Sequence, residues 1–216
     1  TGRVLEGPLF HQFPTRVDTA VFFPRKLEDA RQHLDIPADA LVFVVVGRLS
    51  WGKGWNLLLD AFQKITDSCP KSVLIFVGDG EDRCALKDRA TDLGLDKSVR
   101  ITGFITQSEV SYYVNAADLC LSGSEREGWP TVAVEMLACG CNLVSTEVSG
   151  IRDMITDGLN GYVVSERDPT VFANAVLHAL KLPRAVDHST KIAERYSLKH
   201  LRSDLEEVWP AIRQLS

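Results

Sequence analysis

The stretch LVFVVVG, residues 41–47, decides the fold class of this chain. It is a continuous apolar run, rich in β-branched valine, and it ends at a glycine. A strand that is buried on both faces has this pattern, because the helices of an α/β protein cover a parallel sheet on each side. We therefore predict a parallel sheet with this strand in its interior.

The same alternation of a short apolar run and a helical segment repeats along the chain. We predict five further strands, at residues 72–78, 99–103, 118–124, 142–146 and 162–165. Helices are predicted at residues 27–34, 54–67, 81–93, 107–115, 130–138, 151–155, 168–180 and 198–215, with Ser108 and Asp168 as N-caps of two of them. Six strands alternating with helices predict an α/β fold with a doubly wound, Rossmann-like, six-stranded parallel sheet.

The chain divides into three parts by composition. Residues 1–24 contain three prolines and no clear periodicity, which indicates a connecting segment. Residues 25–180 hold the predicted sheet domain, and residues 181–216 are polar C-terminal helices interrupted by Pro183. Because the first residue is Thr1 and not methionine, we expect a piece of a longer protein.

Composition excludes several classes of protein. The net charge of -5 argues against general nucleic-acid binding, which requires a basic surface. Five cysteines without a C-x-x-C pair predict neither a disulfide framework nor a zinc site. The sequence has no apolar run of transmembrane length and does not open on a secretory signal. We expect a reducing, cytoplasmic location.

Two predicted loops that directly follow strands carry charge. In an open parallel sheet, ligands bind outside the carboxyl ends of the strands. The loop GRLSWGKG, residues 47–54, places Arg48 and Lys53 among three glycines just before a helix. Close backbone approach, a helix N-terminus and two cations together predict a phosphate or diphosphate site. The alternative is a solvated loop with two surface cations.

The second loop, GSEREGWP at residues 123–130, leads into a helix with a single acid. Glu127 lies in the loop, and Glu135 lies in a stretch, residues 131–144, that is otherwise uncharged. A carboxylate in an apolar helix is costly unless it has a partner. Acids placed in this way suit the two ends of an elongated ligand, such as a diphosphate between two sugars. The alternatives are an exposed loop acid for Glu127 and a structural ion pair for Glu135.

Taken in order, these motifs resemble the C-terminal domain of family 4 retaining glycosyltransferases, which have two Rossmann-like domains in the GT-B architecture. VDTAVFFP at residues 17–24 is similar to the family's VDTxxFxP, and GRLSWGKG is similar to its GRLxxxKG. LIFVGDGED at residues 74–82 is similar to its VGDGPE stretch, and the spacing of Glu127 and Glu135 is its most specific local mark. The resemblance covers nearly the whole chain, although Thr15 and Arg16 stand where the family has Asn-Gly.

The resemblance implies one half of a GT-B fold that binds a nucleotide-diphosphate sugar. Arg48 and Lys53 would contact the diphosphate, and Glu127 would bind hydroxyls of the transferred sugar; these three form the implied catalytic set. Glu135 would hold the ribose hydroxyls. The base would lie beside Phe104 and Ile105, and the distal phosphate would face the amides of Thr131 and Val132. The full set of other implied donor-binding residues is Gly47, Gly78, Phe104, Ile105, Gly128, Trp129, Pro130, Thr131 and Val132.

The resemblance also implies what this domain lacks. An N-terminal domain of the same protein, outside this sequence, would bind most of the acceptor, and the C-terminal helices would pack back toward it. No metal ion or cofactor is implied, because cations take the place of a metal in this architecture. Contact with a membrane, at its cytoplasmic face, is expected only through the missing domain or a lipid-linked acceptor. We expect the chain alone to bind donor weakly and not to transfer sugar.

Other functions stay open at this point. A sugar-nucleotide epimerase of the same architecture would also bind a nucleotide sugar, and a phosphorylase would need a lysine that holds pyridoxal phosphate. A non-catalytic nucleotide-sugar-binding module is a further alternative. A dinucleotide-binding dehydrogenase would carry G-x-G-x-x-G after the first strand, where this chain has GRLSWGKG.

Overall fold

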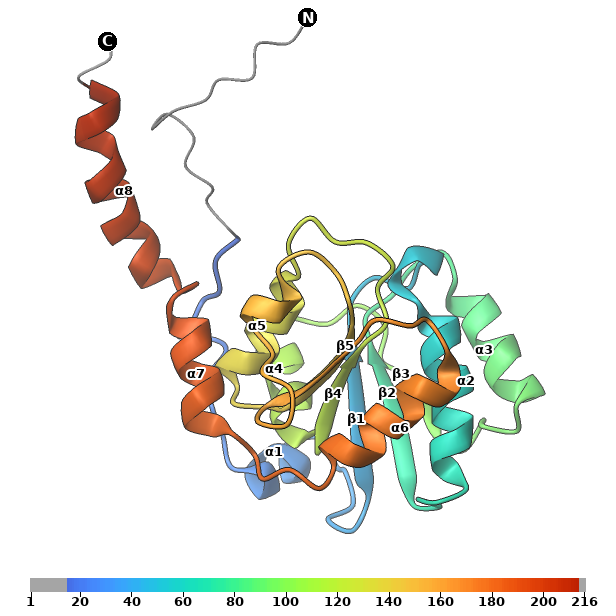
Figure 1. The fold of residues 1–216 in the computed structure, drawn as a ribbon. Helices are drawn as coiled ribbons and strands as arrows, with labels where there is room; N and C mark the ends of the chain where they lie inside the picture. Colours follow the sequence, from blue (N-terminus) through green and yellow to red (C-terminus); the bar gives the residue numbers. More distant parts are fainter. Residues whose placement is uncertain (1–14, 214–216) are drawn as a thin grey trace, which may run out of the picture.

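A computed structural model describes the backbone of residues 15–213 and the side chains of residues 15–206 (Figure 1). Its centre is a six-stranded sheet in the order β3-β2-β1-β4-β5-β6, and all neighbouring strands are parallel. The strands are β1 (Leu41–Val46), β2 (Ser72–Val77), β3 (Val99–Ile101), β4 (Leu119–Ser122), β5 (Leu143–Thr146) and β6 (Gly161–Val164). The predicted doubly wound α/β fold is confirmed, because the chain starts at the centre of the sheet and builds outward in both directions.

Helices cover both faces of the sheet. One face packs against α1 (Leu27–His33), α4 (Gln107–Ala116), α5 (Thr131–Ala138) and α7 (Val186–Glu194). The other packs against α2 (Trp55–Thr66), α3 (Arg83–Asp92) and α6 (Pro169–Ala179). Two 3₁₀ turns, η1 (Trp51–Lys53) and η2 (Ile151–Asp153), lie in loops, and α8 (Leu198–Arg213) projects away from the sheet and its helices (Figure 1).

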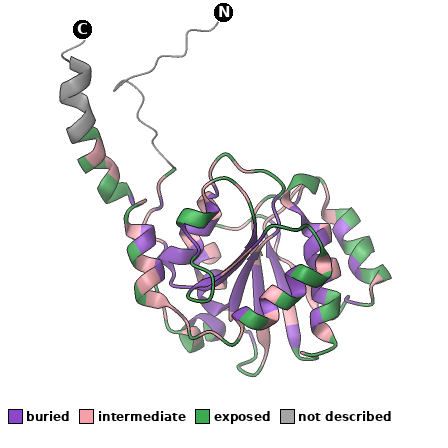
Figure 2. Ribbon diagram, viewed as in Figure 1, coloured by how far each residue is buried: buried purple, intermediate pink, exposed green. Residues whose placement is uncertain are grey.

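Strand β1 shows why the apolar runs become central strands. Val42 and Val44 join the core on the α4 and α5 side, and Phe43 joins the core on the α2 and α6 side. All three are fully buried, as are most residues of the central strands (Figure 2). Both faces of the strand meet helices, so the sequence shows no alternation of apolar and polar residues.

Helix boundaries agree with the predicted ones within one or two residues, but one predicted cap is wrong. Thr106, not Ser108, is the N-cap of α4, and its hydroxyl accepts a hydrogen bond from the Glu109 amide at 3.3 Å. The Asp168 cap of α6 is confirmed, because its carboxylate accepts from the amides of Thr170 and Val171. The short helix predicted at residues 151–155 is the 3₁₀ turn η2.

The part of the predicted connecting segment that is described, residues 15–24, pairs with the turn between α7 and α8. The amide of Val17 donates to the Tyr196 carbonyl at 2.9 Å, and the amide of Leu198 donates to the Val17 carbonyl at 3.0 Å. Arg16, which stands where the resembled family has glycine, forms an ion pair with Asp204 of α8 at 2.5 Å. Residues 1–14 of the connecting segment lie outside the described residues. None of the helices within residues 15–213 has the length and apolarity needed to cross a membrane.

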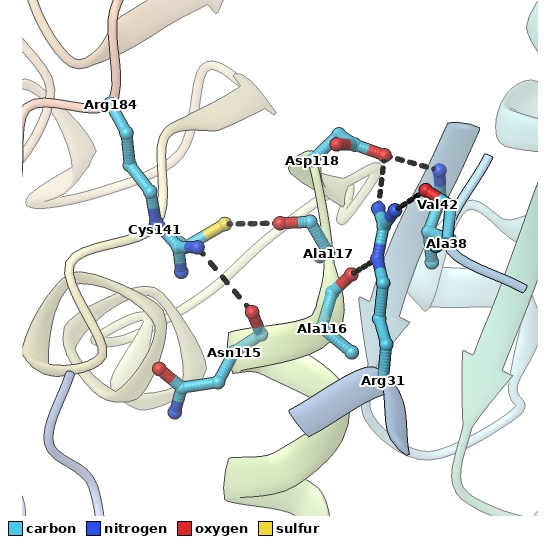
Figure 3. Close-up of polar contacts among 9 residues, drawn as sticks. All are labelled: Arg31, Ala38, Val42, Asn115, Ala116, Ala117, Asp118, Cys141 and Arg184. Carbon is cyan, nitrogen blue, oxygen red and sulfur yellow. Dashed lines mark hydrogen bonds and ion pairs between the residues drawn. The ribbon is translucent and has the colours of Figure 1, made fainter. Parts of the chain in front are cut away.

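A buried arginine joins α1 to the centre of the sheet (Figure 3). The guanidinium of Arg31 donates to the carbonyls of Ala116 at 3.1 Å and Ala38 at 2.8 Å, and it pairs with Asp118 at 2.7 Å. Asp118 also accepts from the Val42 amide at 2.6 Å. This one ion pair therefore connects α1, the end of α4, β1 and the start of β4.

We expect Arg31→Met to lower the free energy of unfolding by about 2–4 kcal/mol, because it leaves the Asp118 carboxylate without its cation and two carbonyls without a donor. Urea titration measures the loss. The matched control is Lys71→Met, which removes an exposed ion pair with Asp39 and should change stability little. Similar losses for the two variants would contradict the importance of the buried pair.

Candidate functional site

Two adjoining hollows lie at the carboxyl ends of the strands. The first hollow, of about 140 Å³, is lined by the loops after β1 and β4 and by the start of α5. The second hollow, of about 540 Å³, is lined by the loops after β1, β2 and β3. The two share Val46, Gly47 and Arg48, so they adjoin with Arg48 at the junction, and we call the pair of hollows the depression. Its place agrees with the rule for ligand sites in open parallel sheets.

Two glycines let the loops around this depression approach each other. Gly54 has φ 67°, and a Cβ there would collide with the Gly123 carbonyl of the loop after β4. Gly78 has φ 146°, and a Cβ there would collide with the Gly47 carbonyl of the loop after β1. Glycine alone tolerates both the backbone conformation and the close contact. The loop after β1 is therefore held between the loops after β2 and β4.

Lys53 and Glu127 meet in the first hollow. The Nζ of Lys53 lies 2.5 Å from Oε1 of Glu127, and the Ser124 hydroxyl donates to the same oxygen at 2.7 Å. The side chain of Glu127 is 19% exposed, so it is not the freely solvated loop acid of the alternative interpretation. Two predicted catalytic residues from different loops thus form an ion pair.

The loop that carries Glu127 is held in place by two residues that are not among the predicted site residues. The guanidinium of Arg167, in the loop after β6, donates to the carbonyls of Gly123 at 3.0 Å and Ser124 at 3.2 Å. The hydroxyl of Thr146, at the end of β5, donates to the Ser124 carbonyl at 2.6 Å. These contacts fix the backbone of Ser124, and Ser124 in turn bonds to Glu127. No local pattern marks Arg167 or Thr146, because each contacts this loop across a long separation in sequence.

Arg48 extends toward the loop after β2 and forms an ion pair with Glu81. Its Nε lies 3.0 Å from Oε2 of Glu81, and the two side chains are 70% and 55% exposed. The backbones of the two loops are bonded to each other, because the Leu49 amide donates to the Asp79 carbonyl at 2.9 Å and the Asp82 amide donates to the Leu49 carbonyl at 3.0 Å. The backbone amide of Glu81 and the guanidinium of Arg48 both lower the pKa of the Glu81 carboxyl.

Trp55 supports the wall of the first hollow. It is almost fully buried at the start of α2, and its indole N–H donates to the Asp82 carboxylate at 2.9 Å. Trp51 packs edge-on against it, with ring centroids 5.8 Å apart, and remains 58% exposed. Of the two tryptophans near this loop, Trp55 is therefore part of the wall, whereas Trp51 lies at the surface.

Glu135 is half-buried on α5, one helical turn beyond Thr131. Thr131 lines the first hollow, and residues four apart lie on the same helix face. Burial raises the pKa of the Glu135 carboxyl to about 7, and no cationic side chain within residues 15–206 offsets that shift. The alternative of a structural ion pair for Glu135 is therefore wrong for the described part of the chain.

The start of α5 differs from the expectation in one respect. The Thr131 amide donates to the Trp129 carbonyl at 2.9 Å, so it is not available to a ligand in this structure. Pro130, with φ −81° and ψ 73°, has the backbone conformation of an inverse γ-turn, which brings the Thr131 amide to the Trp129 carbonyl. Within the described residues, Val132 carries the first amide of α5 without a protein acceptor.

The structure brings most of the predicted site residues together. The first hollow is lined by Gly47, Arg48, Lys53, Glu127, Trp129, Pro130, Thr131 and Val132. The second hollow is lined by Gly47, Arg48, Gly78, Phe104 and Ile105. Phe104 is 90% exposed at its rim. Gly128 and Glu135 line neither hollow.

Comparison with known proteins places this geometry in a family. The family model described as "Glycosyl transferases group 1" matches residues 27–196. A D-inositol 3-phosphate glycosyltransferase of Streptosporangium roseum is 34% identical over 176 residues, which are 77% of this chain and 40% of that protein. The lipopolysaccharide core biosynthesis glycosyltransferase LpsE of Rhizobium meliloti is 35% identical over 167 residues, 76% of this chain and 46% of that protein. The chain thus spans less than half the length of these relatives.

Solved structures share the fold. Sucrose-phosphate synthase from Thermosynechococcus elongatus has a TM-score of 0.83 at 22% identity, over 94% of this chain and 53% of that chain. Anabaena Alr3699/HepE, solved in complex with UDP-glucose, has a TM-score of 0.79 at 24% identity, over 91% of this chain and 56% of that chain. Identities this low establish the fold alone, whereas the family match covers most of the sequence. The chain belongs to the group 1 glycosyl transferases.

Proposed function

We propose that this domain binds a nucleotide-diphosphate sugar and is the donor-binding half of a retaining glycosyltransferase. The observation that supports this most directly is the order of groups along the depression. Arg48 lies at the junction of the hollows, the Lys53–Glu127 pair lies in the first, and Phe104 and Ile105 line the second. A ligand with a charged centre, a polyhydroxyl end and a flat apolar end matches this order.

In this proposal, the diphosphate binds between Arg48 and Lys53. Their charges, together with the Val132 amide at the start of α5, stabilise the negative charge that grows on the departing nucleotide. The two cations neutralise the charge of the diphosphate, as a metal ion does in other sites, so no metal is required. The carboxylate of Glu127 accepts hydrogen bonds from hydroxyls of the transferred sugar.

The acceptor is assigned to the part of the protein outside this sequence. The chain spans 40% and 46% of the two curated relatives, which leaves room for another domain in each of them. We propose that such a domain binds the acceptor, and that the chain alone binds donor without transferring sugar.

Stabilisation by nucleotides tests the proposed function. The ligands to be tested are uridine, guanosine and adenosine diphosphates and their glucose conjugates. At least one of them should raise the melting temperature, because a ligand that binds only the native state stabilises it by mass action. The rise should be the same with EDTA present. Absence of any stabilisation would contradict donor binding, and isomerisation of the sugar without an acceptor would support the epimerase instead.

The half-buried acid Glu135 links nucleotide binding to pH. Its pKa of about 7 lies above the usual value of 4.5, so the native state keeps a proton that the unfolded chain releases. The free energy of unfolding therefore falls as pH rises from about 4.5 to about 7. Ribose hydroxyls would donate to the ionised carboxylate and lower its pKa, so nucleotide affinity would rise over the range around pH 7. The carboxylate thus lowers the stability of the fold and raises the affinity for the nucleotide.

We expect Glu135→Gln to raise the free energy of unfolding at pH 8 by about 1–3 kcal/mol, because it removes a desolvated charge. The gain should be clearly smaller at pH 5, where the native carboxyl is already protonated. The same variant should bind the nucleoside diphosphate about tenfold more weakly at pH 8. Urea titrations and calorimetry at both pH values test this, and equal stability gains at pH 5 and pH 8 would contradict it.

We expect Glu127→Gln to separate recognition of the sugar from recognition of the nucleotide. The sugar nucleotide should bind about tenfold more weakly, because the sugar hydroxyls lose a charged acceptor. The nucleoside diphosphate should bind equally well or better, because Lys53 no longer has a carboxylate partner. Isothermal titration with both ligands measures the difference, and a loss confined to the nucleoside diphosphate would oppose the assignment.

A further inference from the structure

We propose that Glu81 is a positioning residue that holds Arg48 until a diphosphate binds and then competes with the diphosphate for it. Glu81 would thereby weaken the binding of diphosphate ligands and ease their departure. The inference rests on the proposed function and adds to it a residue from the loop after β2 that binds no part of the donor.

The first observation is where the ion pair lies. Arg48 lines both hollows, and its Nε is 3.0 Å from the Glu81 carboxylate. The neighbouring acids have other partners: Asp79 pairs with Arg83 at 2.7 Å, and Asp82 accepts from Trp55 at 2.9 Å. Within residues 15–206, Glu81 is therefore the acid of the loop after β2 that pairs with a cation of the site, Arg48. An anion that binds at the junction must share Arg48 with it or displace it.

The second observation is that the backbone keeps Glu81 close to Arg48. Exposed ion pairs usually contribute little, because two long side chains must be ordered to form them. Here the Gly47 amide also donates to the Val77 carbonyl at 3.0 Å, next to the two hydrogen bonds between Leu49 and the loop after β2. At Gly80, a Cβ would collide with the Leu49 carbonyl, so the two loops lie as close as glycine allows. The carboxylate consequently remains within reach of Arg48.

The third observation is the balance of charge in the site. Each cation has one carboxylate partner, Lys53 with Glu127 and Arg48 with Glu81. When a sugar nucleotide binds, Glu127 gains the sugar hydroxyls as new partners, whereas Glu81 loses Arg48 and gains nothing. After transfer, Glu81 can pair with Arg48 again as the nucleoside diphosphate leaves. Release of the product often limits turnover, and competition from Glu81 would speed the release of the nucleoside diphosphate.

The variant Glu81→Gln tests the competition, because it keeps the shape of the side chain and removes its charge. In titration calorimetry at low salt, the variant should bind inorganic pyrophosphate about two- to fivefold more tightly than the wild type does. The same gain is expected for the nucleoside diphosphate that raises the melting temperature of the wild type. The uncharged nucleoside should bind as it does to the wild type, because it does not compete for Arg48. The control Asp39→Asn removes another exposed carboxylate, the partner of Lys71, and should change none of these affinities.

A double-mutant cycle with Arg48→Ala makes the test specific. In the Arg48→Ala background, Glu81→Gln should no longer tighten binding; a gain that persists would indicate general repulsion and overturn the proposal. Unchanged or weaker binding by Glu81→Gln alone would also overturn it. If the wild type binds none of the three nucleoside diphosphates, the proposed function fails; if it binds one and Glu81→Gln does not tighten it, only this inference fails.

Discussion

The site depends on the close backbone contact that the loop after β1 makes with its two neighbours. Gly54 lies against the Gly123 carbonyl on one side, and Gly78 lies against the Gly47 carbonyl on the other. These contacts place the cations of one loop within reach of acids on two others. A side chain at either glycine would collide with a backbone carbonyl of the neighbouring loop, so the loops could not keep this approach.

The cations of the site are balanced by carboxylates of the same chain, and this determines how the site can bind an anion. Lys53 and Arg48 each have a carboxylate partner, so a bound diphosphate exchanges partners and does not simply fill a positive pocket. Glu135 is the exception, because it is half-buried without a described cation and therefore holds a proton near neutral pH. A native state that carries such a group is less stable than it could be, and a ligand that supplies hydrogen-bond donors recovers the loss.

The sheet and its helices could be predicted because burial on two faces leaves a direct trace in the sequence. The run at β1 is apolar throughout, the run at β2 is apolar after Ser72, and each of these apolar residues packs into the core on one side of the sheet. Details that depend on a single backbone angle were less predictable. Thr106 and Ser108 both carry a hydroxyl near the start of α4, and only the extended backbone at Thr106 makes it the cap.

By itself, the sequence determined the fold class, the resemblance to a glycosyltransferase family and the set of charged groups at the strand ends. Only the tertiary structure decided which charge faces which: that Lys53 pairs with Glu127, that Arg48 pairs with Glu81, and that Arg167 supports the loop after β4. The physical reason is that these contacts join loops from different strands. Their distances depend on how the strand ends are spaced across the sheet, and no stretch of neighbouring residues contains that spacing.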